Sequence, residues 1–185
     1  MIQYRGSVFE TNSSSAHSLV ILDKPFDYYT PEEAQKELWV YYDEDTGIYN
    51  PQEDLYFGRY PFRILRTFED KLNYAYANAP HRLIIDKKNH KSRWSTEYWR
   101  ISRVVKNIIP GFKKAIFESF YDKPSKDQGM LWPWLKQHGI TMEQFLLDKT
   151  IIVICDGDEY HAWKHMKEDG LINLGIIKKE IGIND

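Results

Sequence analysis

Apolar residues cluster in short runs along the first part of the chain, and polar breaks separate these runs. Two of them, Gln3–Phe9 and Leu19–Leu22, predict strands joined by a serine-rich loop. The second run ends at Asp23–Pro25, because proline interrupts a strand. Thr30–Glu33 then combines a capping threonine, a proline and a capping glutamate, so a helix is expected from there to about Val40.

Two longer stretches repeat apolar residues at helical spacing. The first begins at Pro61 and stops before Pro80, and its predicted apolar stripe is Ile64, Leu65, Phe68, Leu72 and Tyr76. The second ends at Pro110-Gly111, and its predicted stripe is Trp94, Tyr98, Ile101, Val105 and Ile108. Each stretch therefore predicts an amphipathic helix with one side in the core.

The last third of the chain predicts short helices around a buried strand. The expected helices are Phe112–Tyr121, Met130–His138, Thr141–Asp148 and Glu159–Glu168. Ile151–Cys155 is the clearest strand, and its unbroken apolarity indicates a central position covered on both faces. A last strand is expected around Leu174–Lys178. The sequence therefore predicts a single α+β domain over residues 1–185, with a small central β-sheet covered by several α-helices.

Composition narrows the setting without naming a reaction. The chain has 185 residues, of which 42% are hydrophobic, so it can bury a substantial core. Its apolar runs are too short to span a bilayer, and its first residues lack the apolar core of a secretory signal. A lone cysteine, Cys155, excludes an internal disulfide and a thiolate zinc cluster. We expect a soluble, cytoplasmic protein without a cofactor and without a membrane partner.

Charge is distributed in two opposed blocks, although the formal net charge is only −2. The segment 23–57 holds ten acidic residues and two lysines, whereas the segment 81–114 holds ten basic and two acidic residues. Such asymmetry is typical of a surface for a charged partner. The alternative is that the two blocks dock on each other or stay solvated.

Aromatic side chains lie among the acidic residues of the first block, and aromatic rings often anchor protein interfaces. The carboxylates could imitate a phosphate backbone and occupy the cationic groove of a nuclease. A plain acidic surface loop is the alternative. The partner-binding candidates in this block are Asp43, Glu44, Asp45, Tyr49 and Tyr56.

The second block interleaves cations with aromatic residues. Cations suit phosphate contacts, and exposed rings can stack on unpaired bases. Trp94 and Tyr98 belong to an apolar stripe and are expected in the core, so Trp99 is the candidate surface ring. The candidates for contact with nucleic acid or an acidic protein are Lys87, Lys88, Lys91, Arg93, Trp99, Arg100 and Arg103. A solvated surface is the alternative, and the sequence contains no base-reading motif.

A serine-rich segment near the N-terminus is the most unusual local feature. Hydroxyls and main-chain amides that converge on one spot can hold a phosphate, and Glu10 and His17 could exchange protons beside it. Alternatively, the same side chains tie their own turn together, and no P-loop accompanies them. The phosphate-binding candidates are Thr11, Asn12, Ser13, Ser14, Ser15 and Ser18.

A resemblance to known proteins is carried by the string VFETNSSSAHS at Val8–Ser18. This string resembles a segment shared by small uncharacterised proteins of bacteriophages and mobile elements of Firmicutes-type bacteria. It brings no assigned chemistry with it, but it implies a phage-like setting. Proteins of this size in that setting often bind host machinery, and inhibitors of CRISPR effector nucleases are one such class.

A further cluster follows the predicted central strand, at the strand end where sites in α/β sheets usually form. Asp156 and Asp158 could act as acid or base, and His161 and His165, one helical turn apart, could bind a metal with them. The glutamate that follows the first histidine in zincins is absent from this sequence. The alternative is that the carboxylates cap the next helix, so the sequence does not commit the protein to a metal.

These observations favour a binding protein over an enzyme. The hypothesis is a phage or mobile-element protein that inhibits or modulates a host protein or nucleoprotein, with a CRISPR effector nuclease as the specific case. Two alternatives stay open. One is a small enzyme that acts on a phosphate-containing or nucleotide substrate through the serine-rich loop, and the other is a nucleic-acid-binding module.

Overall fold

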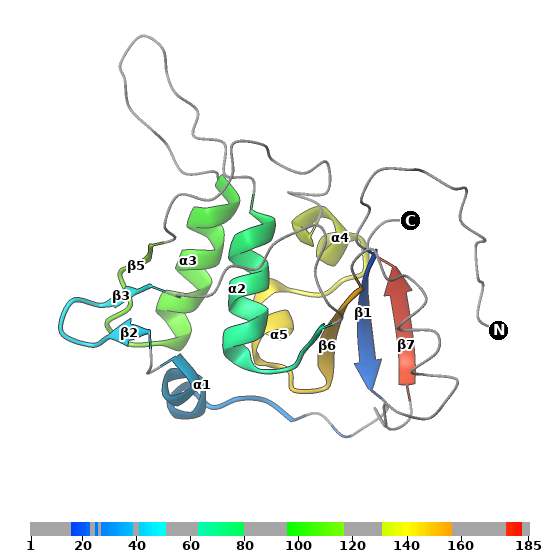
Figure 1. Cartoon of the computed structure of the whole chain (residues 1–185), viewed down its shortest axis with the longest axis horizontal. Coiled ribbons are helices and arrows are strands. Elements are labelled where there is room, and N and C mark those ends of the chain that lie inside the picture. The colour runs from blue at the N-terminus through cyan, green and yellow to red at the C-terminus, as the bar shows by residue number, and fades with distance from the viewer. Residues whose placement is uncertain are drawn as a thin grey trace, which may run out of the picture.

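The structure of the protein is a computed structural model, which describes residues 16–22, 25, 27–38, 41–50, 63–79, 96–116, 131–156 and 177–182. Helices and strands are mixed along the chain and form an α+β fold, as predicted (Figure 1). In chain order the elements are β1 (Ala16–Leu22), α1 (Pro31–Leu38), β2 (Tyr42–Asp43), β3 (Ile48–Tyr49), β4 (Arg63–Leu65), α2 (Phe68–Asn78), α3 (Thr96–Ile108), β5 (Lys114–Ala115), α4 (Leu131–Gln137), α5 (Met142–Leu147), β6 (Ile151–Asp156) and β7 (Ile177–Gly182). Within these residues the strands form one four-stranded and one three-stranded sheet.

The four-stranded sheet has the order β4-β6-β1-β7, and each strand is antiparallel to its neighbours. β6 lies between β4 and β1, which confirms the central position predicted from its unbroken apolar run. Leu19 pairs with Val153, and Val20 pairs with Ile152. Successive side chains of a strand point to opposite faces of the sheet. Leu19 and Val153 therefore lie in the main core, and Val20 and Ile152 lie in a second apolar cluster on the other face. Both faces of β6 are therefore buried at this level.

Helices α1, α2, α3 and α5 lie to one side of the four-stranded sheet (Figure 1). Their buried residues join Leu19 and Val153 in the main core, which is rich in aromatic rings. Tyr76 of α2 and Tyr98 of α3 have ring centroids 5.3 Å apart, and the Tyr76 hydroxyl lies 3.0 Å from Ser102 Oγ. The core thus supplies the hydrogen-bond partner that a buried tyrosine hydroxyl requires.

α2 begins later than the apolar spacing predicts. Ile64 and Leu65 lie in β4, which pairs with β6, so the prediction that they belong to a helix was wrong. The helix starts directly after Thr67, because the Thr67 side chain caps it and accepts a hydrogen bond from Asp70 N at 3.0 Å. The other members of the predicted stripe are buried in α2, namely Phe68, Leu72 and Tyr76.

The three-stranded sheet is small and has the order β2-β3-β5. β2 and β3 form a hairpin whose turn contains Gly47 at a φ of 68°, and β5 pairs with β3 in parallel. The prediction of a helix over Phe112–Tyr121 was wrong for its described part, because Lys114–Ala115 is a strand. Gly47 O accepts a hydrogen bond from Lys113 N at 2.8 Å. A Cβ at position 47 would lie 2.2 Å from Gly111 O, so this close approach requires glycine.

Two helices begin at the capping boxes that the sequence predicts. In α1 the Thr30 hydroxyl accepts a hydrogen bond from Glu33 N at 3.2 Å, and the Glu33 carboxylate accepts one from Thr30 N at 2.9 Å. In α5 the Thr141 hydroxyl accepts a hydrogen bond from Gln144 N at 3.0 Å, and the Gln144 side-chain oxygen accepts one from Thr141 N at 2.9 Å. Each box therefore satisfies two backbone N–H groups at a helix start.

The remaining predicted elements differ in outcome. α3 buries its predicted stripe at Tyr98, Ile101, Val105 and Ile108. α4 covers most of Met130–His138. The last strand, β7, spans Ile177–Gly182 and includes the described end of the strand expected around Leu174–Lys178. The expected strand Gln3–Phe9 and the expected helix Glu159–Glu168 lie outside the described residues.

Candidate functional site

The acidic segment predicted to meet a partner lies on the surface, on the turn between β2 and β3. Asp43, Glu44 and Asp45 are all exposed. Asp43 organises the turn, because its carboxylate accepts hydrogen bonds from the Thr46 hydroxyl at 2.6 Å and from Asp45 N at 3.0 Å. These bonds, above all the one from the Thr46 side chain, hold the pKa of Asp43 below its usual range. Asp43 is therefore a structural residue as well as a surface charge.

The acidic surface continues onto α1. Gln35 donates a hydrogen bond to the Glu44 carboxylate at 2.8 Å, which links the helix to the turn. Glu32 and Glu33 are exposed in the first turn of α1, where acidic side chains suit the positive end of the helix dipole. We refer to these carboxylates together as the acidic face, and its members are Asp27, Glu32, Glu33, Asp43, Glu44 and Asp45.

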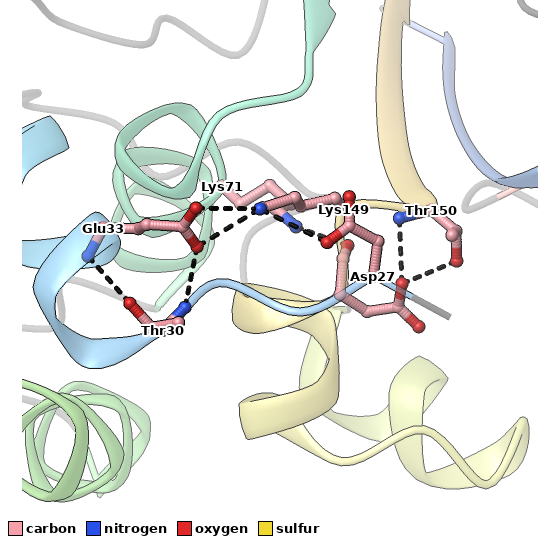
Figure 2. Close-up of polar contacts among 7 residues, drawn as sticks. Asp27, Thr30, Glu33, Lys71, Lys149 and Thr150 are labelled. Atoms are coloured by element: carbon pink, nitrogen blue, oxygen red, sulfur yellow. Dashed lines mark hydrogen bonds and ion pairs between the residues drawn. The ribbon is translucent and has the colours of Figure 1, made fainter. Parts of the chain in front are cut away.

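Two lysines neutralise part of the acidic face. Lys149 Nζ lies 3.3 Å from the carboxylate of Asp27 and 3.2 Å from that of Glu33 (Figure 2). Lys113, at the end of the basic block, helps to keep Asp43 ionised. The two charge blocks of the sequence therefore meet where β5 joins the hairpin. Within the described residues, the members of the acidic face that are in no ion pair are Glu32, Asp43, Glu44 and Asp45.

The aromatic candidate Tyr49 is buried. Its exposed fraction is 0%, and its hydroxyl lies 2.7 Å from Asn73 Oδ1 and 3.1 Å from Glu69 Oε1, both on α2. Burial, followed by the nearby charge of Glu69, raises the pKa of the Tyr49 hydroxyl. Tyr49 therefore joins β3 to α2, and the structure does not support it as an anchor for a partner. Tyr28, next to Asp27 in the chain, is 43% exposed and is accessible instead.

The basic candidates on α3 occupy its exposed side. Every residue of α3 is described, and the exposed ones are Thr96, Trp99, Arg100, Arg103, Lys106 and Asn107. Trp99 is 51% exposed, as expected for a surface ring, and Glu97 is half-buried. Arg103 and Lys106 form no ion pair with another residue in the described part of the chain. We call Trp99, Arg100, Arg103 and Lys106 the α3 face.

Two ring contacts orient the α3 face. The Trp99 ring stands at 89° to the ring of buried Tyr98, with centroids 5.2 Å apart. The Arg100 guanidinium carbon lies 5.3 Å from the ring centroid of Trp132 on α4, which is a cation–π contact. Both side chains are thus held against neighbouring rings before any partner binds.

The start of β1 and the end of β6 lie side by side. His17 and Ser18 belong to β1, and Asp156 is the last residue of β6. The register places Ala16 opposite Asp156 and His17 opposite Cys155. The chain therefore enters β1 and leaves β6 at the same end of the four-stranded sheet.

The other predicted site residues lie outside the described residues. These are Glu10, Thr11, Asn12, Ser13, Ser14, Ser15, Tyr56, Lys87, Lys88, Lys91, Arg93, Asp158, His161 and His165. Among the residues that are described, no group of three or more histidines, cysteines and carboxylates could hold a metal ion. No helix in that same part of the chain is long and apolar enough to span a bilayer.

A buried lysine is the feature that the sequence analysis missed. Lys71 of α2 has an exposed fraction of 0%, and its Nζ donates a hydrogen bond to Asp148 O at 2.8 Å. The ring centroid of Tyr29 lies 5.7 Å from the same Nζ. Lys71 follows buried Phe68 by three residues and precedes buried Ala75 by four. A lysine in an apolar helical stripe was therefore the signal that could have revealed it.

The surroundings of Lys71 form a structural network (Figure 2). Burial lowers the pKa of Lys71 from its ordinary value of 10.5 to about 8, although the carboxylates of Asp148, Glu37 and Asp70 act in the opposite direction. The buried Asp148 carboxylate also accepts hydrogen bonds from the Thr150 hydroxyl at 2.6 Å and from Thr150 N at 2.8 Å. The network ties α2 to the link between α5 and β6.

No protein-family model matches the chain, and no curated protein or solved structure proves significantly similar to it. The resemblance of Val8–Ser18 to phage proteins therefore stays a prediction. The candidate site rests on the geometry of the chain itself, and its accessible parts are the acidic face and the α3 face.

Proposed function

We propose that the protein is a non-enzymatic binding protein that inhibits or modulates a host protein or nucleoprotein. The observation that carries this proposal is the α3 face, where Trp99 is 51% exposed among Arg100, Arg103 and Lys106. The acidic face supports it with a second surface of opposite charge. The resemblance of Val8–Ser18 supports a phage or mobile-element setting, in which a CRISPR effector nuclease is the specific partner we propose.

The charges of Glu44, Asp45, Arg103 and Lys106 contribute little to folding. An ion pair between exposed side chains is worth about 0–1 kcal/mol, and Arg103 and Lys106 form none within the described residues. The same charges act strongly on association, because complementary surfaces raise the encounter rate and exclude partners of the wrong sign. Substitutions at these four residues are therefore expected to affect binding far more than stability.

Affinity capture from a bacterial host extract tests the proposal. Four forms of the protein are immobilised in parallel, and retained proteins and nucleic acids are identified over a range of salt concentrations. Asp43 is left unchanged in all of them, because it holds the hairpin turn. The forms are wild type, Glu44→Gln with Asp45→Asn, Arg103→Gln with Lys106→Gln, and Glu143→Gln, a control at an exposed carboxylate of α5.

A defined partner is expected on wild type and on the control. Each face variant should retain at most about one fifth as much of this partner as wild type does, because charge pairs across the interface are lost. The remaining binding should also depend less on ionic strength. Equal retention on all four forms, or no partner retained at low salt, would overturn the proposal.

One observation favours a second candidate, a small enzyme that acts on a phosphate-containing or nucleotide substrate. Because Ala16 pairs with Asp156, the first residue of β1 and the last residue of β6 lie side by side at one end of the four-stranded sheet. A panel of phosphate esters and nucleotides tests this candidate with wild type, His17→Ala and Asp156→Asn. Turnover that both substitutions abolish would support it, and the lack of turnover by wild type would reject it.

A further inference from the structure

We infer that the α3 face binds single-stranded nucleic acid, with Trp99 stacking on an unpaired base and its three cations contacting phosphates. The inference rests on the proposed function and names what this surface recognises. The first support is the distribution of charge on α3. Arg100, Arg103 and Lys106 are exposed, whereas the one acidic residue of the helix, Glu97, is half-buried.

The spacing of these side chains suits a short stretch of nucleic acid. Trp99 and Lys106 are separated by seven residues, so they lie about 10 Å apart along the helix axis at 1.5 Å per residue. In a stacked, helical strand, successive nucleotides are offset by about 3.4 Å along the helix axis. The α3 face therefore spans roughly three nucleotides, with one cation for each phosphate.

Trp99 supplies the contact that charge alone does not. The perpendicular Tyr98 ring holds the indole at a centroid distance of 5.2 Å, while 51% of Trp99 stays exposed. Tyr98 is itself anchored, because its hydroxyl donates a hydrogen bond to Ala115 O at 2.5 Å. A ring that is held in place and exposed offers a base a stacking surface at little cost in side-chain entropy.

Arg100 adds a second planar group next to Trp99. Its guanidinium already lies over Trp132, 5.3 Å from the ring centroid. A guanidinium in this position can contact a phosphate and still keep its ring contact. Arg100 and Trp132 therefore form a pair of flat groups that joins α3 to α4, and Arg100 is next to Trp99 in the chain.

Single-stranded nucleic acid fits this surface better than the other anionic partners. In a duplex the bases stack on each other, so only the phosphates are available to α3 and the exposed indole gains nothing. An acidic peptide likewise matches the cations but offers no flat base for stacking. The exposed ring and the cations together therefore favour single-stranded nucleic acid over a duplex or an acidic peptide.

Fluorescence anisotropy with a labelled twelve-nucleotide oligothymidylate tests the inference on the full chain. Titrations are run at salt concentrations of about 50 mM and about 200 mM. A duplex of the same length and a polyglutamate peptide compete for binding. The variants are Trp99→Ala, Trp99→Phe, Arg103→Gln with Lys106→Gln, and Lys36→Gln, a matched control at an exposed lysine of α1.

We expect the single strand to bind more tightly than the duplex or the peptide. Trp99→Ala should weaken this binding roughly tenfold, and Trp99→Phe should restore most of it because a ring remains for stacking. Loss of Arg103 and Lys106 should reduce the slope of log affinity against log salt by about 1.4, or about 0.7 for each lost phosphate contact. Lys36→Gln should change neither quantity, and circular dichroism confirms that each variant is folded.

Three results would overturn the inference: no binding of the single strand at about 50 mM salt, tighter binding of the duplex or the peptide, and an affinity that does not depend on Trp99. If one of these occurs while the α3 variant still loses a captured host partner, only the inference fails. If capture from the extract is unaffected by either face variant, the proposed function fails.

Discussion

Raising the pH from about 7 to about 9.5 should stabilise the folded protein, because Lys71 is buried as a cation at neutral pH. Its side chain has an exposed fraction of 0%, and its Nζ has one hydrogen bond, to Asp148 O at 2.8 Å. Folding removes this ammonium group from water, and no carboxylate among the described residues forms an ion pair with it. The folded protein therefore favours the neutral amine more strongly than the unfolded chain does.

The size of the effect follows from the pKa. Burial lowers the pKa of Lys71 from 10.5 to about 8, so between these values the unfolded chain binds more protons and stability rises with pH. The gain from pH 7 to 9.5 is about 2 kcal/mol, since a full proton difference contributes about 1.4 kcal/mol for each pH unit. Above about pH 10 stability should fall again. Burial raises the pKa of Tyr49 and Tyr76, so these tyrosines lose their protons at lower pH in the unfolded chain than in the folded protein, which favours unfolding.

Urea unfolding, followed by far-UV circular dichroism at a series of pH values, measures this gain in wild type and Lys71→Met. Methionine keeps most of the length of the side chain without its charge, but it leaves Asp148 O without its hydrogen bond. The wild-type midpoint should rise by about 1 M urea over this pH range if the m-value is about 2 kcal/mol/M. The midpoint of Lys71→Met should stay constant. A flat wild-type profile, or the same slope in Lys71→Met, would refute the reasoning.

Three further substitutions test single contacts, each by the free energy of unfolding in urea. Thr67→Ala should cost about 1 kcal/mol by removing the cap of α2, whereas Thr67→Ser should cost less because its hydroxyl remains. Gly47→Ala should destabilise the fold more than Gly139→Ala. Both glycines have a φ of 68°, so alanine strains the backbone at either position. Only at position 47 does the added Cβ also clash, because it would lie 2.2 Å from Gly111 O, whereas a Cβ at position 139 meets nothing within 4 Å. Tyr49→Phe should cost about 1 kcal/mol, because the half-buried side chains of Glu69 and Asn73 on α2 lose their hydroxyl partner.

The elements that the sequence predicts correctly are those with a complete local signal. Thr30–Glu33 and Thr141–Gln144 contain every group of their capping boxes, so both helix starts are visible without tertiary information. Ile151–Cys155 has a length and an apolarity that suit a strand buried on both faces. The stripe of α3 is equally plain, because its buried residues recur over three turns.

The errors occur where distant pairing decides the local structure. Ile64 and Leu65 fit a helical stripe as well as a strand, and only their pairing with β6 selects the strand. Lys114–Ala115 is too short for a periodic signal and becomes a strand through its partner β3. The burial of Lys71 could have been inferred from its apolar helical stripe, but its partner could not, because the hydrogen bond joins residues 77 positions apart.

Trp99 and Tyr49 show how the candidate site separates from the core. Both are aromatic residues among charged neighbours, and both were expected to contact a partner. Tyr49 lies in β3, where its ring is buried in the core and its hydroxyl is hydrogen-bonded to Asn73 of α2. Trp99 follows buried Tyr98 by one residue, which rotates it about 100° around α3 and away from the apolar stripe. Because core packing does not account for an indole that is 51% exposed, Trp99 is the residue at which loss of binding and loss of stability can be separated.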